Sequence, residues 1–256
     1  MKRPLFLLAP MGAIAFPATI LTPYRTLTII GDMLDRPSIE AFEKQASVVL
    51  GLGCVGFVGA IFLAVGLVAI LQHRCEMTRA EVVPHLIAAA LLLLGSATAV
   101  LGVLQLMKSF NTLATAANVI PGQFLNDVSV ARWPLIFGAI CLAIGAIVVF
   151  WSTRPASDAT NYSPTGGAGS GFFGVMAAAI LVLSCLWNLS SVYNLQGFDS
   201  STNLRPNVFA AIISQVLLST LGAVSAFAAF AVAVLLKGLS ASQIAGEGGR
   251  GNKGKR

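Results

Sequence analysis

Long apolar runs separated by short polar segments fill almost the whole chain. Six of these runs are long enough for a helix of about 20 residues to cross the ~30 Å hydrocarbon core of a membrane. None of the six contains Asp, Glu, Lys or Arg. The pattern therefore predicts an all-α, polytopic membrane protein with six transmembrane helices, at about residues 5–23, 47–72, 82–107, 133–151, 172–193 and 208–236.

The six runs come in three similar pairs. In each pair, an apolar run is followed by a loop proline, and the prolines lie about 84 residues apart, at Pro37, Pro121 and Pro206. A glycine inside the next apolar run follows sixteen or seventeen positions later, at Gly53, Gly138 and Gly222. An aromatic residue with a nearby leucine is expected to mark the first turn of each loop, beginning at Tyr24, Phe110 and Tyr193. A fixed period is typical of repeated supersecondary units, so we predict three tandem helical hairpins.

The repeat divides the chain into five segments. Hairpin 1 is expected over 1–80, hairpin 2 over 81–154 and hairpin 3 over 171–237. Residues 155–170, rich in Ser, Pro, Thr and Gly, are predicted to be a flexible linker, and 238–256 a basic disordered tail. Because proline fits the first turn of a helix, each return helix is expected to begin at its loop proline. The N-terminus also resembles a signal peptide, but we expect the first span to be retained because the repeat needs it as a partner.

Composition and charge agree with a lipid environment. Apolar residues make up 56% of the chain and charged residues 10%, whereas soluble domains have about 25% charged residues. Ten of the Lys and Arg residues lie before the first span or after the second, fourth and sixth, which predicts that both termini are cytoplasmic. The net charge of +6 comes mostly from the C-terminal tail, which we expect to contact lipid rather than nucleic acid.

Small residues recur at helical spacing along the return helices. Helices associate in lipid by close approach across small residues, so these faces are predicted to be helix–helix seams. They contain Gly51, Gly53, Gly56, Gly59 and Ala60 in the second span, and Gly138, Ala139, Gly145 and Ala146 in the fourth. The cysteines inside the spans, Cys54, Cys141 and Cys185, are expected to act as small buried hydrophobes.

The sequence has no pattern of catalytic residues, metal ligands or a phosphate-binding loop, so it predicts a protein that is not an enzyme and needs no cofactor or metal. The polar groups at membrane depth are hydroxyls and amides, and hairpin 3 has most of them. They either bond to their own backbone or a neighbouring helix, or they line a polar crevice between spans five and six that receives a charged group from a partner. The candidate lining residues are Asn188, Ser214, Gln215, Ser219 and Thr220.

Two motifs point to a known family. Hairpin 2 reads Leu101-Gly102-Val103 and then Phe110-Asn111-Thr112-Leu113-Ala114 before its loop proline. After its own proline, hairpin 3 reads Ile213-Ser214-Gln215-Val216-Leu217-Leu218-Ser219-Thr220-Leu221-Gly222, and Ser129 is equivalent to Ser214. These hairpins resemble the last two helices of the MotA/TolQ/ExbB proton-channel family. The chain departs from that family in having three hairpins, little cytoplasmic mass, and Gln215 where the family has Glu.

The resemblance implies a scaffold or channel-forming subunit that packs around a partner's single transmembrane helix. The partner, rather than this chain, would carry the titrating Asp within the membrane. The resemblance also implies a bacterial inner-membrane protein that works in an oligomer or hetero-complex. Two alternatives stay open, namely a purely structural subunit of a larger membrane complex and a small-solute transporter.

Overall fold

The computed structural model describes residues 7–35, 39–74, 79–115, 121–153, 164–196 and 206–251. Seven α-helices occupy these ranges: α1 (Leu8–Ala15), α2 (Ala18–Asp35), α3 (Ile39–Arg74), α4 (Arg79–Thr115), α5 (Pro121–Thr153), α6 (Pro164–Gln196) and α7 (Pro206–Gly251). Within the described residues, six segments are long and apolar enough to cross a membrane: Leu8–Asp32, Ser47–Ile70, Val82–Ser109, Leu125–Thr153, Ala168–Gln196 and Ala210–Leu239. The prediction of an all-α protein with six membrane spans is confirmed.

The helix starts follow the prolines. Both α5 and α7 begin at their loop prolines, Pro121 and Pro206, as predicted, and α6 also begins at a proline, Pro164. Proline is favoured there because its missing N–H group would have no helical partner in the first turn. Pro37 lies outside the described residues. Helix α6 thus starts within the predicted linker 155–170, and α7 continues through most of the predicted tail 238–256.

The helix ends differ from the prediction. The aromatic and leucine markers do not begin loops, because Tyr24, Phe110 and Tyr193 all lie within helices that continue to Asp35, Thr115 and Gln196 respectively. A helix satisfies its own backbone hydrogen bonds both in lipid and beyond it, so it has no reason to end at the last apolar residue. The spans therefore project past the apolar runs as polar helical turns.

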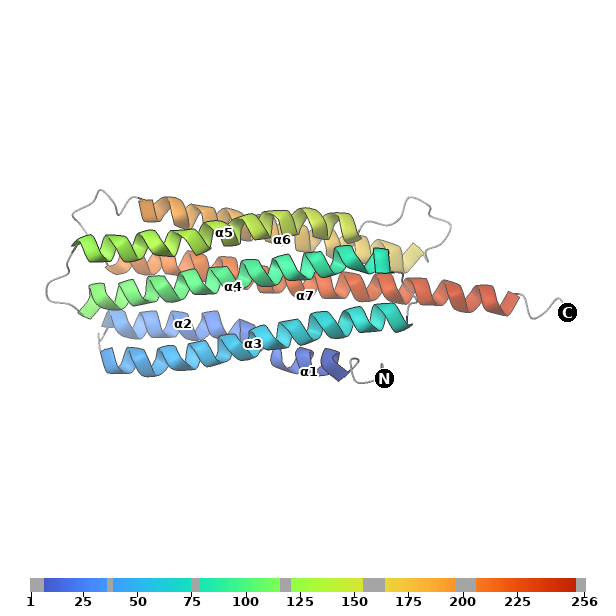
Figure 1. Ribbon diagram of the computed structural model, residues 1–256, viewed down its shortest axis with the longest axis horizontal. Coiled ribbons are helices and arrows are strands. Elements are labelled where there is room, and N and C mark those ends of the chain that lie inside the picture. Colours follow the sequence, from blue (N-terminus) through green and yellow to red (C-terminus); the bar gives the residue numbers. More distant parts are fainter. Residues whose placement is uncertain are drawn as a thin grey trace.

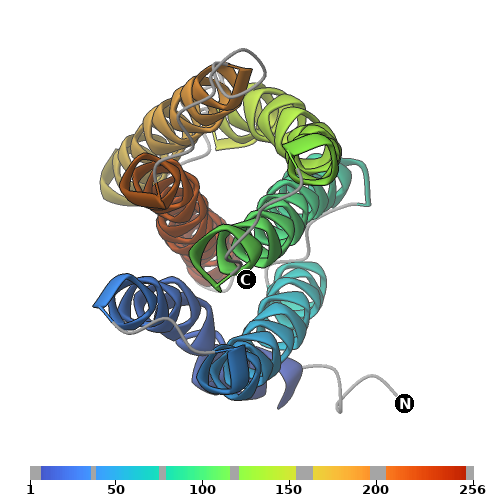
Figure 2. The same ribbon diagram turned by 90° about the vertical axis from the view of Figure 1, so that its left-hand side faces the viewer.

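Helices α4, α5, α6 and α7 form a ring of four. Each contacts the next, and α7 closes the ring against α4 (Figure 2). Large buried side chains fill this ring, including Leu92, Leu142 and Leu181 at one level and Leu106, Leu135, Leu195 and Ile213 at another. A positively charged side chain donates a hydrogen bond to a last-turn helix carbonyl at each end of the ring. Arg132 of α5 donates to the Leu195 carbonyl of α6 at 2.7 Å. Lys237 of α7 donates to the Ser152 carbonyl of α5 at 2.7 Å. Helix C-termini attract positive charge in this way.

The first hairpin lies outside this ring. Helices α1 and α2 both pack on α3, while α3 contacts α4 and α2 contacts α7 (Figures 1 and 2). The start of α1 and the end of α7 lie at the same end of the molecule, as an even number of crossings requires (Figure 1). The fold therefore consists of a closed four-helix unit and an attached helical pair.

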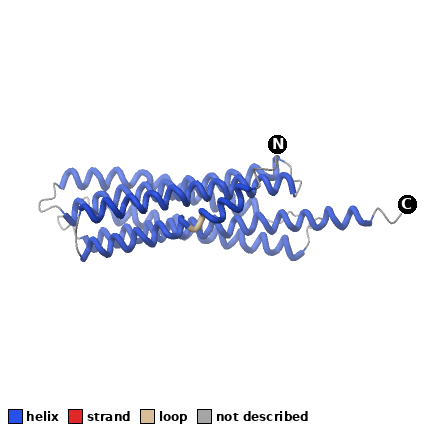
Figure 3. Tube along the Cα trace, turned by 90° about the horizontal axis from the view of Figure 1, so that it is seen from below, coloured by secondary structure: helices blue, strands red, loops and turns tan. Residues whose placement is uncertain are grey.

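The first span is interrupted part-way along the molecule. Phe16 and Pro17 separate α1 from α2, and this is the tan segment in Figure 3. Pro17 has no N–H to donate to the carbonyl of Ala13, so the helical ladder loses one hydrogen bond at the break. Proline alone does not end a helix here, because Pro23, Pro84 and Pro134 lie inside continuous helices. Beyond the break, Thr19 N–H donates to the Phe16 carbonyl at 2.9 Å, and the Thr19 hydroxyl donates to the same oxygen at 2.6 Å.

The predicted glycine seams are largely confirmed. A Cβ on Gly59 would lie 2.7 Å from the Cβ of Ala15, one on Gly138 2.9 Å from Thr98 Oγ1, and one on Gly145 3.2 Å from Leu92. At Gly59 and Gly138 a neighbouring helix approaches too closely for a side chain, and at Gly145 the Leu92 side chain would have to shift slightly. The prediction is wrong for Gly51, where a Cβ would meet nothing within 4 Å, and for Gly53, where the nearest atom, Thr22 Cγ2, lies at an ordinary 3.8 Å.

Candidate functional site: an apolar groove beside the first hairpin

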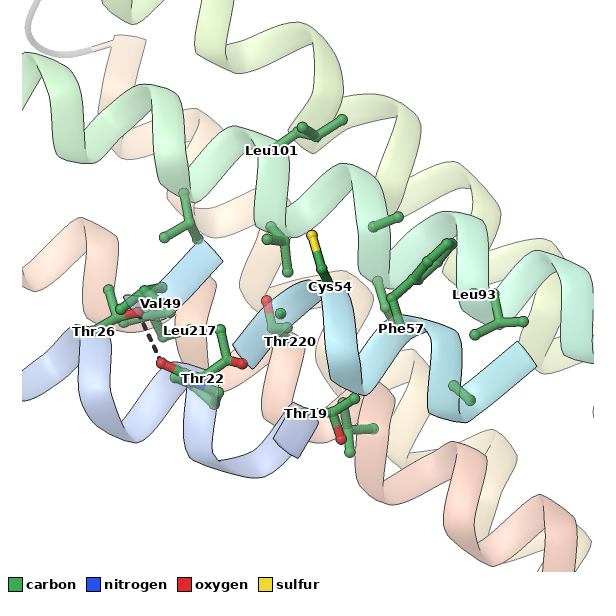
Figure 4. Close-up of a pocket in the computed structure, with 18 of the residues that line it drawn as sticks. Thr19, Thr22, Thr26, Val49, Cys54, Phe57, Leu93, Leu101, Leu217 and Thr220 are labelled. Carbon is green, nitrogen blue, oxygen red and sulfur yellow. Dashed lines mark hydrogen bonds between the residues drawn. The ribbon is translucent and has the colours of Figure 1, made fainter. Parts of the chain in front are cut away.

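An apolar groove of about 300 Å³ lies between the first hairpin and the ring. Four helices line it, and Figure 4 shows side chains from these helices around it, among them Thr22, Phe57 and Leu217. They contribute Thr19, Thr22 and Thr26 from α2, Gly53, Cys54 and Phe57 from α3, Leu93, Ser96, Ala97 and Leu101 from α4, and Leu217, Thr220 and Val224 from α7. No lining residue is charged. All of them lie within segments that are long and apolar enough to cross a membrane, so the groove faces lipid in any orientation in which these helices span the bilayer.

The groove has a buried back wall and an open mouth. Along the back, formed by α2 and α7, Thr26 is 1% exposed, Leu217 4% and Val224 6%. At the mouth, formed by α3 and α4, Leu50 is 49% exposed and Leu101 58%. The groove therefore opens sideways between α3 and α4, in the direction from which lipid would enter.

Aromatic and aliphatic side chains limit the groove along its length. The rings of Phe16 and Phe227 meet at one end, with their centroids 5.5 Å apart. Near the other end, Val49 and Val103 belong to a buried cluster that also contains Ile29. The break in the first span places Phe16 at this point, so the groove follows α2 and not α1.

Five hydroxyl groups line the groove, yet none presents a free proton to it. Each donates to a carbonyl one turn earlier in its own chain, at distances of 2.6 to 3.0 Å: Thr19 to Phe16, Thr22 to Ala18, Thr26 to Thr22, Ser96 to Leu92, and Thr220 to Val216. Hydroxyls in membrane helices commonly satisfy themselves in this way. The groove surface is consequently apolar in character, despite the residue types that form it.

The residues predicted to line a polar crevice in hairpin 3 are distributed over several contacts. Asn188 of α6 is fully buried, and its amide donates to the Leu135 carbonyl of α5 at 3.1 Å. A Cβ on Gly138 would lie 3.3 Å from the same amide nitrogen. The Oδ1 atom of Asn188 has no hydrogen-bond partner. Asn188 therefore lies in the contact between α5 and α6.

Two further candidates join α6 to α7. The Gln215 side-chain oxygen accepts from Asn194 at 3.2 Å and from Ser191 at 3.4 Å. Ser219 is fully buried and donates to the Ser184 carbonyl at 2.6 Å. These are interhelical hydrogen bonds of the kind that hold membrane helices together.

The last two candidates bond to their own helix. Ser214 donates to the Ala210 carbonyl at 2.9 Å, and Thr220 to that of Val216. Of the five candidates, Thr220 is the one whose side chain lines the groove. The structure does not bring the five residues together in one cavity.

Sequence reasoning missed most of the groove. Thr19, Thr22 and Thr26 follow one another at the i, i+3, i+7 spacing of a single helix face, and this signal could have found them. The prediction that Cys54 is buried is wrong, because it is exposed at the mouth of the groove, whereas Cys141 and Cys185 are buried as predicted. Comparisons of this chain with protein-family models, with curated proteins and with solved structures find no match. The MotA/TolQ/ExbB resemblance therefore stays a prediction.

Proposed function

We propose that this protein is a non-enzymatic subunit of a membrane assembly that holds an apolar guest, taken from within the bilayer, in the groove between α2, α3, α4 and α7. The observation that carries the proposal is the groove itself: a volume of about 300 Å³ with a buried back wall and a mouth open between two apolar spans. Pockets of this size and apolar character are typical of ligand-binding sites.

The distribution of polar groups supports this position for the guest rather than the contact between α6 and α7. In that contact, Gln215 and Ser219 already have partners in α6. A guest inserted there would have to break these hydrogen bonds inside the membrane, where water cannot replace them. A guest in the groove breaks no hydrogen bond between helices, since each lining hydroxyl donates to a carbonyl one turn earlier in the chain.

The test places a photoreactive diazirine amino acid at position 93, in the groove, and in a second protein at position 183, on the exposed face of α6. Each is combined with Gly53→Phe, which fills the groove, or with Gly51→Phe, its matched control two residues away. After illumination of native membranes, we expect adducts at position 93 to fall several-fold with Gly53→Phe and not with Gly51→Phe. Adducts at position 183 should respond to neither substitution.

The choice of control follows from the surroundings of the two glycines. A Cβ on Gly53 would meet Thr22 Cγ2 at 3.8 Å, an ordinary contact, and one on Gly51 would meet nothing within 4 Å. Neither substitution therefore begins with a clash at Cβ, and only position 53 lines the groove. If Gly53→Phe leaves the adducts at position 93 unchanged, the groove holds no guest and the proposal is wrong.

A further inference from the structure

We infer that the guest is a single hydrocarbon chain, one acyl chain of a membrane phospholipid, and not a transmembrane helix. This inference rests on the proposed function and names the occupant of the same groove.

The groove is long and narrow. On α4 its lining extends from Leu92 to Leu104, and on the first span from Phe16, in the break, to Thr26 of α2. At 1.5 Å per residue these distances are about 18 Å and about 15 Å. The groove volume of about 300 Å³ is about twice that of an apolar cavity that holds one benzene molecule, and it cannot enclose an α-helix, which with its side chains is about 10–12 Å wide. A whole helix cannot lie in this space.

A hydrocarbon chain fits the same dimensions. A hydrocarbon chain without branches is one carbon atom wide, and carbon atoms pack at about 3.5–4.0 Å from one another, so such a chain needs far less space than a helix. An apolar cavity of about 150 Å³ holds one benzene molecule with its six carbons. By that ratio, the groove holds about a dozen carbons, which is most of one acyl chain.

The lining selects for a chain without polar groups. The five hydroxyls are occupied by their own helices, and the remaining lining residues are apolar. The mouth between α3 and α4 lets a chain enter sideways, so that the headgroup stays at the membrane surface. Because lipid tails are as apolar as the groove, the hydrophobic effect does not favour entry. Occupancy instead follows from the dispersion contacts that an empty groove would lose.

Residues of the back wall can report an occupant of the groove, because lipid at the outer surface of the protein cannot reach them. Leu217 and Val224 are 4% and 6% exposed, so a lipid outside the groove does not contact them. Leu142 and Leu181 are buried in the ring and provide internal controls. Ile140 and Leu183, which are exposed on α5 and α6, report the labelling by bulk lipid.

The experiment reconstitutes the full-length protein in vesicles of pure phosphatidylcholine whose acyl chains carry a diazirine, and maps the adducts by mass spectrometry after illumination. We expect adducts on Leu217 and Val224 at a frequency about tenfold lower than on Ile140 and Leu183, in line with their smaller exposed surface, and none on Leu142 or Leu181. Gly53→Phe should reduce the back-wall adducts at least several-fold, and Gly51→Phe should not. Ala97→Phe provides a second way of filling the groove from α4, in case Gly53→Phe fails to fold.

The outcomes separate the two proposals. Back-wall adducts that disappear when the groove is filled support the acyl chain. If the back wall stays unlabelled in pure lipid while position 93 still gives adducts sensitive to Gly53→Phe in native membranes, the guest is another molecule, such as a partner's peptide segment, and this inference is wrong. If neither experiment detects an occupant, the proposed function fails with it.

Discussion

The first and third hairpins have the same landmark glycine in opposite surroundings. A side chain on Gly222 of α7 would collide with Ser184 Oγ of α6, the other helix of its hairpin. The equivalent residue of the first hairpin, Gly53, has only Thr22 Cγ2 nearby, at 3.8 Å, and lines the groove. The repeat therefore places a small residue at the same position in each return helix. Whether that residue is packed against its neighbour or lines a groove depends on the position of the other helix in the hairpin.

The difference comes from the first span and not from the return helix. Up to the break, α1 packs tightly on α3, where Gly12 and Gly66 have no room for a Cβ. Beyond Phe16 and Pro17, α2 contacts α7 as well as α3, and the space opposite Gly53 is left open. Helix α6, which has no internal proline, stays against α7 along its length. Small residues permit close approach in lipid, but they form a seam only where the partner helix lies directly opposite them.

The largest effect is expected from adding one methyl group to the closed seam. Gly222→Ala should lower the free energy of unfolding by about 1–3 kcal/mol, because overpacking a well-packed contact costs that much. The nearest atom is Ser184 Oγ, and the next atom of the same residue, its Cβ, would lie at 3.5 Å, an ordinary distance. Ser184→Ala should therefore restore most of the stability lost in Gly222→Ala. Reversible unfolding in mixed micelles, monitored by circular dichroism, measures all four proteins of this cycle.

The double-mutant cycle distinguishes a steric contact from a general loss of packing. If Gly222→Ala and Ser184→Ala simply add, the two residues do not compete for the same space. A coupling energy near zero would contradict the closed seam described for the third hairpin.

The fold could be predicted from the sequence to the extent that hydropathy and proline position determine it. Six long apolar runs without charge can only be membrane helices, and Pro121 and Pro206 begin helices because of the chemistry of their ring. Helix ends were not predictable in the same way. Tyr24 and Phe110 stand where the apolar runs stop, but the helices continue, because backbone hydrogen bonding does not depend on the side chains being apolar.

The groove was harder to predict, because it exists where α2 and α3 do not pack closely at Gly53. The polar groups of hairpin 3 predicted a site there, but in the structure Asn188, Gln215 and Ser219 form hydrogen bonds between helices. The spacing of Thr19, Thr22 and Thr26 marks one face of a helix, but it does not show whether a neighbouring helix covers that face. The space between Thr22 and Gly53 depends on how α2 and α3 pack beyond the break at Phe16 and Pro17, and hydrophobic patterning carries no information about that packing.

A smaller effect is expected from the hydrogen bond that crosses the closed seam. Ser219→Ala removes the 2.6 Å bond to the Ser184 carbonyl and should lower the free energy of unfolding by about 0.6 kcal/mol, and by at most about 1.7 kcal/mol, the range measured for hydrogen bonds between membrane helices. Ser225→Ala is the matched control, since Ser225 is exposed on the same helix and donates to its own Leu221 carbonyl. The same unfolding assay compares the two. An equal loss for both variants would show that Ser219 contributes nothing specific to the contact between α6 and α7.

The smallest effect, and one of opposite sign to Gly222→Ala, is expected in the open hairpin. Gly53→Ala adds a methyl group that meets only an ordinary contact at 3.8 Å, so overpacking does not oppose it. Alanine is favoured over glycine inside a helix by up to about 1 kcal/mol, and the free energy of unfolding should therefore stay the same or rise by less than that amount. Gly51→Ala, which faces no neighbour, should give the same small gain, because both substitutions then report only the helical preference of α3. A loss of stability in Gly53→Ala without one in Gly51→Ala would mean that α2 and α3 close against each other in the membrane. In that case the first hairpin would pack like the third, and the groove would not be available to any guest.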